Sequence, residues 1–169
     1  PYSYRSRIKA KTLIVNGGND PYWTIDALGL YLKDLKQPTW TMVVPNAGHD
    51  LGDRLWLLRT LTAFCQSVAG RFPMPRFKAD VGAAETRFSS VSAGARRFRI
   101  WAIESKTLDF RPEKWKVLVE MTIEGGSGGS PILRYGPSST NRALMAEVEF
   151  KVRDRTFSLT TPVRVFKRR

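Results

Sequence analysis

The chain has 169 residues, and its 28 Lys and Arg residues against 15 Asp and Glu residues give a formal net charge of +13 at pH 7. Apolar residues make up 42% and charged residues 25% of the sequence, a globular composition that excludes wholesale disorder and collagen-like repeats. No apolar run approaches the roughly 20 residues of a membrane-spanning helix, so no transmembrane segment is expected. One cysteine, Cys65, excludes an internal disulfide framework and a cysteine-cluster metal site.

The first 36 residues contain a strand pattern followed by a helix pattern. Residues 11–16 form a short apolar run closed by Gly-Gly-Asn-Asp-Pro, which predicts a buried strand that ends in a loop. A helix is expected over residues 25–35, with Thr24 or Asp26 as its N-cap. Its apolar residues fall on one face, at Ile25, Leu28, Leu32 and Leu35.

The same order of strand and helix recurs in the next segment. Residues 40–44 predict a second buried strand, which ends at Pro-Asn-Ala-Gly-His over residues 45–49. A second helix is expected to follow and to bury one stripe, formed by Leu51, Leu55, Leu58, Thr62, Cys65 and Val68. On that stripe Cys65 is expected to be buried and inert. Strands joined by a helix are normally parallel, so residues 1–72 are interpreted as the edge portion of a larger α/β sheet.

The pattern changes at residues 71–75, where two prolines predict a linker. We expect this joint to be exposed and to be cut by proteases near residues 72–74. Beyond it the helical periodicity disappears and alternating runs predict half-buried antiparallel strands, at residues 86–89, 97–104, 115–121, 145–150 and 162–166. About seven strands in ~95 residues suit an immunoglobulin-like β-sandwich, which we assign to residues 75–169.

Two features of the second half allow alternative interpretations. The glycine-rich segment 125–130 is either a natural hairpin loop, which the flanking strand patterns favour, or an engineered linker. Residues 75–169 carry a net charge of +9, against +4 for residues 1–74. The basic groups form either a solvated surface or a site for an anionic ligand, and they are Arg96, Arg97 and Arg99; Lys151, Arg153 and Arg155; and Lys167, Arg168 and Arg169.

Two polar side chains follow the two predicted parallel strands. His49, the single histidine, comes directly after the second strand, and Asp20 has the equivalent place after the first. Catalytic residues of open α/β sheets lie at the carboxyl ends of strands, so a carboxylate and an imidazole are expected to meet there. Such a pair makes a general base, because the carboxylate fixes the ring tautomer and stabilises the imidazolium. In the alternative interpretation, Asp20 caps a turn and His49 packs against the following helix.

The remaining candidate groups are few. Tyr22 and Trp23 could equally line a substrate cleft or belong to the core or to an interface. One His and one Cys give no metal-ligand spacing, and no glycine-rich phosphate loop is present, so neither a metal nor a cofactor is expected. The chain order Asp then His matches the last two members of an α/β-hydrolase triad, but residues 1–19 contain no Gly-x-Ser-x-Gly nucleophile motif.

These segments resemble the PhoPQ-activated pathogenicity-related proteins. The more specific part of the resemblance lies in residues 13–28, 38–40 and 44–49, and the less specific part in residues 101–102, 109–111, 115, 146–148 and 157–163. It implies an α/β-hydrolase domain followed by a β-rich domain, a serine-hydrolase mechanism and a secreted or periplasmic location. It places the acid at Asp20 and the base at His49. It also implies that the nucleophile and most of the sheet lie in sequence upstream of Pro1, in a chain that is mature, truncated or excised.

The sequence therefore predicts an α/β portion at residues 1–72, a β-sandwich at residues 75–169 and two hypotheses for function. In the first, Asp20 and His49 are part of a serine hydrolase that cleaves an ester or amide in a small molecule or peptide, and the missing upstream region is a partner. In the second, the basic β-domain is a non-catalytic module that binds an anionic partner.

Overall fold

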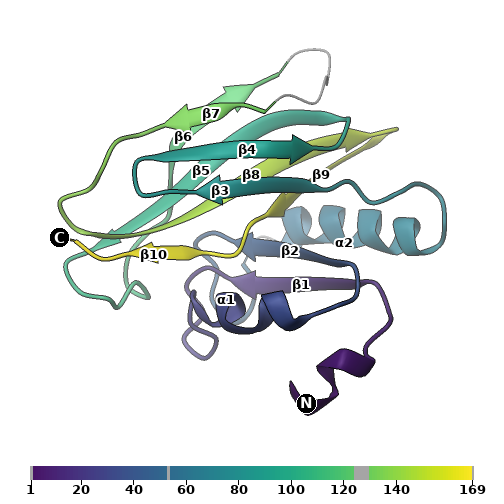
Figure 1. The fold of residues 1–169 in the computed structure, drawn as a ribbon, viewed down its shortest axis with the longest axis horizontal. Helices are drawn as coiled ribbons and strands as arrows, with labels where there is room; N and C mark the ends of the chain where they lie inside the picture. The colour runs from purple at the N-terminus through teal and green to yellow at the C-terminus, as the bar shows by residue number, and fades with distance from the viewer. Residues whose placement is uncertain (1, 53, 124–129, 169) are drawn as a thin grey trace.

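The computed structural model describes residues 2–52, 54–123 and 130–168, which form short helices and three sheets (Figure 1). The segment 124–129, most of the glycine-rich stretch, lies outside the described residues. The first part of the chain contains the 3₁₀-helix η1 (Tyr2–Arg7), β1 (Thr12–Gly17), α1 (Ala27–Tyr31), the 3₁₀-helix η2 (Leu32–Asp34), β2 (Thr39–Val44) and α2 (Arg54–Val68). The second part contains β3 (Phe77–Val81), β4 (Glu85–Val91), β5 (Ala95–Ser105), β6 (Lys116–Thr122), β7 (Ile132–Arg134), β8 (Asn141–Val152), β9 (Arg155–Thr160) and β10 (Arg164–Phe166).

The strand–helix–strand–helix order expected for the first part is present. β1 and β2 pair in parallel, from Thr12 beside Thr39 to Gly17 beside Val44. The first helix is shorter than expected, because only five residues are α-helical before the chain tightens into η2. Asp26 stands at the N-cap of α1 but makes no side-chain capping bond. No helix of the described residues is long and apolar enough to cross a membrane.

The second part is almost entirely antiparallel sheet. One sheet has the order β10-β8-β5-β6, with β9 also pairing along β8, and the other has the order β3-β4-β7. The two sheets share a core in which Phe88 of β4 meets Phe98 of β5, with their ring centroids 4.8 Å apart. The sequence pattern missed β3, β7 and β9. The immunoglobulin-like arrangement stays a prediction.

The outer face of the larger sheet is covered by the first part of the chain. Val43 of β2 packs in one cluster with Ile103, Met145 and Trp115. Helix α2 lies along β9, where Thr60 Oγ1 donates a hydrogen bond of 3.0 Å to the Ser158 carbonyl. Strand β8 is therefore buried on both faces, not half-buried as its alternation predicts, because a layer packs on each side of it.

Helix α2 buries a different face from the one that its sequence predicts. The expected stripe faces solvent: Leu55 is 61% and Leu58 53% exposed, and Cys65 is exposed as well. The expectation that Cys65 is buried is therefore wrong. The buried residues are Thr60, Ala63 and Ser67, whose small side chains let the helix backbone approach β9 closely.

The joint between the two parts is buried at Phe72, Met74 and Pro75 and exposed at Arg71 and Pro73, so the expectation of an exposed linker is not met at its apolar residues. Phe72 is 7% and Met74 6% exposed, and both belong to the same core cluster as Phe88 and Phe98. Trp40 of β2 joins this cluster, and its indole N–H donates to the Pro75 carbonyl at 2.8 Å. Alternate residues of this segment therefore pack into the shared core.

Candidate functional site

The candidate site lies at the carboxyl ends of β1 and β2, where two loops are held against each other. The amide N–H of Gly18 donates to Val44 O at 2.7 Å, and that of Asn19 donates to Ala47 O at 2.8 Å. Gly17 is required here, because a Cβ at this position would lie 2.2 Å from Gly48 O. The parallel register thus brings the loop after each strand into direct contact.

Asp20 lies under these loops with its side chain only 3% exposed. Its Oδ1 accepts hydrogen bonds from the backbone N–H groups of Tyr22 (2.8 Å) and Trp23 (3.1 Å), which leaves Oδ2 for His49. Burial raises the pKa of Asp20, but the hydrogen bonds from His49, Tyr22 and Trp23 outweigh burial, so the pKa lies below its ordinary value. The carboxylate is therefore ionised at neutral pH.

His49 makes the contact that the strand-end rule predicts, and this part of the expectation is confirmed. Its Nδ1 lies 2.9 Å from Asp20 Oδ2. Because an ionised carboxylate only accepts hydrogen bonds, Nδ1 must be the donor, and Nε2 carries the lone pair of the neutral ring. The ring is 60% exposed, and no described residue forms a hydrogen bond to Nε2.

The two aromatic residues after Asp20 lie at the surface. Tyr22 is 75% and Trp23 59% exposed, which excludes a core role for both. The Tyr22 ring meets the His49 ring edge to face, with centroids 5.2 Å apart and planes at 83°. Tyr22 therefore lies beside the exposed imidazole.

A loop of the β-rich part holds the site loops from the other side, which the sequence pattern did not reveal. Asn46 and Trp115 form a reciprocal pair: Asn46 Nδ2 donates to Trp115 O at 3.0 Å, and Trp115 N–H donates to Asn46 Oδ1 at 2.8 Å. The Trp115 indole N–H donates to Gly18 O at 3.0 Å. Asn19 Nδ2 donates to three carbonyls of the same loop, the shortest bond being 2.8 Å to Glu113 O. The loop between β5 and β6 thus fixes both strand-end loops.

This loop also forms a pocket with one wall at Asp20. The cavity of about 460 Å³ has apolar walls from Ile25, Leu108, Phe110 and Val165. Arg111 and Lys167 contribute positive charge, and Asp26 and Asp109 contribute negative charge. Arg111 donates two side-chain hydrogen bonds to Asp109, which with its backbone N–H lower the pKa of Asp109 to about 2.

The basic groups of the second half are partly neutralised by neighbouring strands. Arg99 pairs with Glu120 and with Glu147 Oε1, the latter at 3.0 Å. Arg97 lies 3.9 Å from Glu149, and Arg155 lies 3.5 Å from Asp154. These three arginines therefore do not present free cations to an anionic partner.

Comparison with known families supports one assignment. The family model of the PhoPQ-activated pathogenicity-related proteins matches residues 1–111, about two thirds of the chain. The chain belongs to the PhoPQ-activated pathogenicity-related protein family. No curated protein matches it.

The family match includes the residues that build the site. It spans β1, β2 and both of the loops that carry Asp20 and His49, and it extends to Arg111 in the loop that packs on them. The resemblance noted in residues 13–28 and 44–49 is therefore confirmed as PhoPQ-related family membership. Trp115 and the strands from β6 onward lie outside the matched segment.

Proposed function

We propose that this chain supplies the acid and the base of a serine hydrolase of the α/β-hydrolase type, which cleaves an ester or amide by acyl transfer. Asp20 is the acid and His49 the base. The observation that carries this proposal is the 2.9 Å contact between Asp20 Oδ2 and His49 Nδ1 at the ends of adjacent parallel strands. A buried ionised carboxylate and an exposed imidazole together form two thirds of a catalytic triad.

The contact at Nδ1 supports one direction of proton transfer. Asp20 holds Nδ1–H, so Nε2 accepts the proton of an attacking hydroxyl and later returns it to the leaving group. The negative charge of Asp20 stabilises the imidazolium formed between these two steps. Exposure of the ring leaves Nε2 accessible to a nucleophile and to a substrate that packs against Tyr22.

Two surfaces support an upstream region as the source of the serine. The second edge of β2 lies against β9, where Val43 N–H donates to Thr160 Oγ1 at 2.8 Å, so the parallel sheet can be extended only beyond β1. Among the described residues β1 pairs only with β2, and its apolar residues are half-buried. On α2, Leu58 is 53% and Leu61 40% exposed, which is further apolar surface that an upstream region could cover.

The test uses a protein in which this chain follows the upstream region that the proposal requires, assayed with p-nitrophenyl butyrate. Asp20→Asn should lower kcat by about 10⁴-fold, because the ring loses the partner that fixes its tautomer. His49→Ala should lower kcat at least as much, since no base remains. Asp154→Asn, which removes an exposed carboxylate far along the chain, serves as the control and should leave kcat unchanged.

Thermal unfolding of the same proteins separates chemistry from folding. His49→Ala should leave the unfolding temperature nearly unchanged, because the ring is mostly exposed. Full turnover in a folded His49→Ala protein would refute the catalytic role of His49. The alternative function, a basic module for an anionic partner, stays a prediction, and steep salt dependence of heparin binding is the measurement that favours it.

A further inference from the structure

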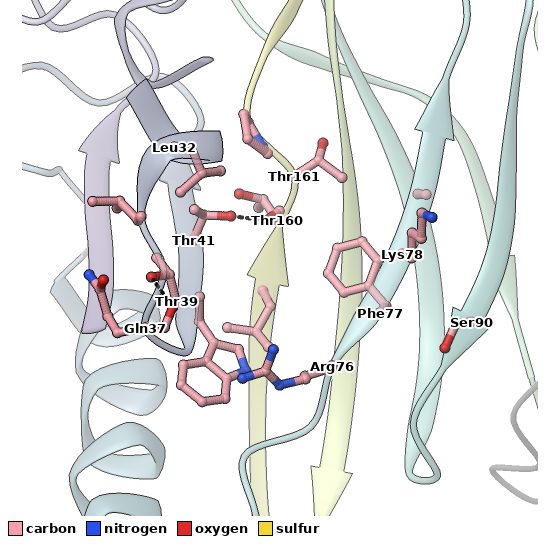
Figure 2. A pocket seen from close by; sticks show the side chains of 15 residues that line it. Leu32, Gln37, Thr39, Thr41, Arg76, Phe77, Lys78, Ser90, Thr160 and Thr161 are labelled. Carbon is pink, nitrogen blue, oxygen red and sulfur yellow. Dashed lines mark hydrogen bonds between the residues drawn. The ribbon is translucent and has the colours of Figure 1, made fainter. Parts of the chain in front are cut away.

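A second cavity lies at the opposite end of β2 from Asp20 and His49. It occupies about 590 Å³ between β2 and β3, a volume typical of small-molecule sites, which range from about 300 to 1,000 Å³. Figure 2 shows Leu32, Thr39 and Thr41 on one side, Phe77, Lys78 and Ser90 on the other, and Thr160 and Thr161 between them. We call this cavity the β2–β3 groove. It shares no residue with the catalytic loops.

The charged side chains that line the β2–β3 groove are all positive. Its lining includes two cations, Arg76 and Lys78, and no Asp or Glu. Within the described ranges neither cation has an ion-pair partner, whereas Arg97, Arg99 and Arg155 each lie beside a carboxylate. Two uncompensated cations beside one cavity favour an anionic ligand.

Arg76 is held in place by contacts other than a hydrogen bond to a carboxylate. Its guanidinium stacks on the Trp40 ring, 4.5 Å from the centroid. The Arg76 backbone is fixed by its N–H, which donates to Ser92 Oγ at 2.8 Å, and Trp40 is fixed by its bond to Pro75 O. A guanidinium that lies over an aromatic ring keeps its N–H groups in its own plane, where they can bind a carboxylate or phosphate.

The rest of the lining combines apolar and hydroxyl groups. Apolar surface comes from Leu32, Leu35, Phe77, Leu159 and Pro162, and hydroxyls come from Thr39, Thr161 and Ser90. A charged group alone would leave this apolar surface in contact with water. A ligand with an anionic head and an apolar body uses both parts of the groove.

We propose that the β2–β3 groove binds a small organic anion with an apolar body, with its acidic group on Arg76 and Lys78 and its body against Phe77, Leu159 and Pro162. This site is independent of the proposed hydrolase function. Its position between β2 and β3 also means that an occupied groove links the parallel and antiparallel layers.

The test is an NMR titration of this chain with three probes: 4-phenylbutyrate, its neutral amide and inorganic phosphate. Phenylbutyrate should shift the Trp40 indole N–H and the backbone amides of Ala79 and Thr161 saturably. The neutral amide should bind about tenfold or more weakly, because a charge-assisted bond to Arg is lost. Phosphate should also bind more weakly, because it contributes no apolar surface.

Matched double variants locate the site. Arg76→Gln with Lys78→Gln should weaken phenylbutyrate binding about tenfold or more. Lys9→Gln with Lys151→Gln, which removes the same charge from exposed positions outside the groove, should change binding less than about twofold. No saturable shifts with phenylbutyrate, equal binding of the amide or of phosphate, or equal weakening by both double variants would overturn the proposal.

Discussion

Asp20 and His49 differ in exposure in the way that a proton-transfer pair requires. The carboxylate is 3% exposed and bound by two backbone N–H groups, so its position is fixed by the loop itself. The ring is 60% exposed and meets the protein through Nδ1 and the Tyr22 edge. Asp20 is therefore part of the folded framework, while the His49 ring faces solvent.

This arrangement predicts a change in the pKa of Asp20. His49→Ala removes a hydrogen bond that lowers this pKa, so the pKa should rise in the variant. The Asp20 pKa is measured by carboxyl ¹³C NMR over about pH 1.5–7. This range spans the ordinary Asp pKa of about 3.9. Asp154→Asn is the control and should leave the Asp20 titration as it is. An unchanged Asp20 pKa in His49→Ala would contradict the hydrogen bond.

The sign of the accompanying stability change follows from the same shift. The pKa of Asp20 in the folded chain is depressed, so its contribution to stability is complete above the unfolded-state value of about 3.9. That contribution is lost as the pH falls through the folded-state pKa. In His49→Ala the folded-state pKa lies closer to the unfolded-state value, so the loss is smaller and is complete at a higher pH.

A buried charge inside the larger sheet gives a second prediction at the residue scale. Glu147 is fully buried and accepts bonds from Arg99 (3.0 Å), the Trp101 indole (2.6 Å) and Ser158 Oγ (2.6 Å). Glu147→Ala leaves Arg99 without this partner and should lower the free energy of unfolding by about 3–5 kcal/mol. Glu149→Ala, at a more exposed position, should lower it by no more than about 1 kcal/mol. Urea denaturation measures both, and equal values would contradict the role of the Glu147 network.

Among the elements, those set by local pattern were predictable and those set by distant partners were not. The spacing of residues 11–16 and 40–44 correctly predicted β1 and β2, and the strand-end rule predicted the contact between Asp20 and His49. The buried face of α2 was predicted wrongly, because its partner is β9, almost a hundred residues away. The sequence of α2 alone does not reveal that the face packed on β9 needs small side chains.

The loop between β5 and β6 was missed for the same reason. Asn46 was visible in the sequence after a strand, but its partner Trp115 lies 69 residues later. Trp115 was assigned to a strand, whereas β6 begins only at Lys116. A side chain that is buried by another layer cannot be distinguished, from one sequence, from a side chain that is buried by its own sheet.

The loop between β5 and β6 should control the order of the two loops that carry Asp20 and His49. Asn46→Gly removes the reciprocal bonds to Trp115 while tolerating the positive φ of 57° at this position. Amide hydrogen exchange at Gly18 and Asn19 should accelerate about tenfold or more. The free energy of local opening falls in the variant, because the two hydrogen bonds between Asn46 and Trp115 no longer have to be broken. Thr60→Ala removes a comparable bond between layers away from the site and should leave both amides protected. Equal protection in Asn46→Gly would contradict the positioning role of the loop.

For the whole molecule, the layers form a continuous interior. Trp40, Ala63, Phe72 and Met74 from the first 74 residues share one apolar cluster with residues of both antiparallel sheets. The sequence predicted a division near residue 73 because the hydrophobic period changes there. A change of period records a change of secondary structure, and it does not show whether the two parts share a core.

The shared core predicts cooperative unfolding. Urea denaturation followed by far-UV circular dichroism and by tryptophan fluorescence should give a single transition with coincident midpoints. Limited proteolysis should spare residues 72–74, because Phe72 and Met74 are buried. Two separate transitions, or early cleavage at this joint, would show that the parts fold independently.

The central claim is that Asp20 holds His49 as a donor at Nδ1 and leaves Nε2 free to accept a proton. Because the chain has one histidine, ¹⁵N NMR of the side chain reports this ring without ambiguity. At a pH at which the ring is neutral, the account predicts a proton on Nδ1 and none on Nε2, and in Asp20→Asn a loss of this preference. A neutral ring that carries its proton on Nε2 in the unmodified chain would contradict the account.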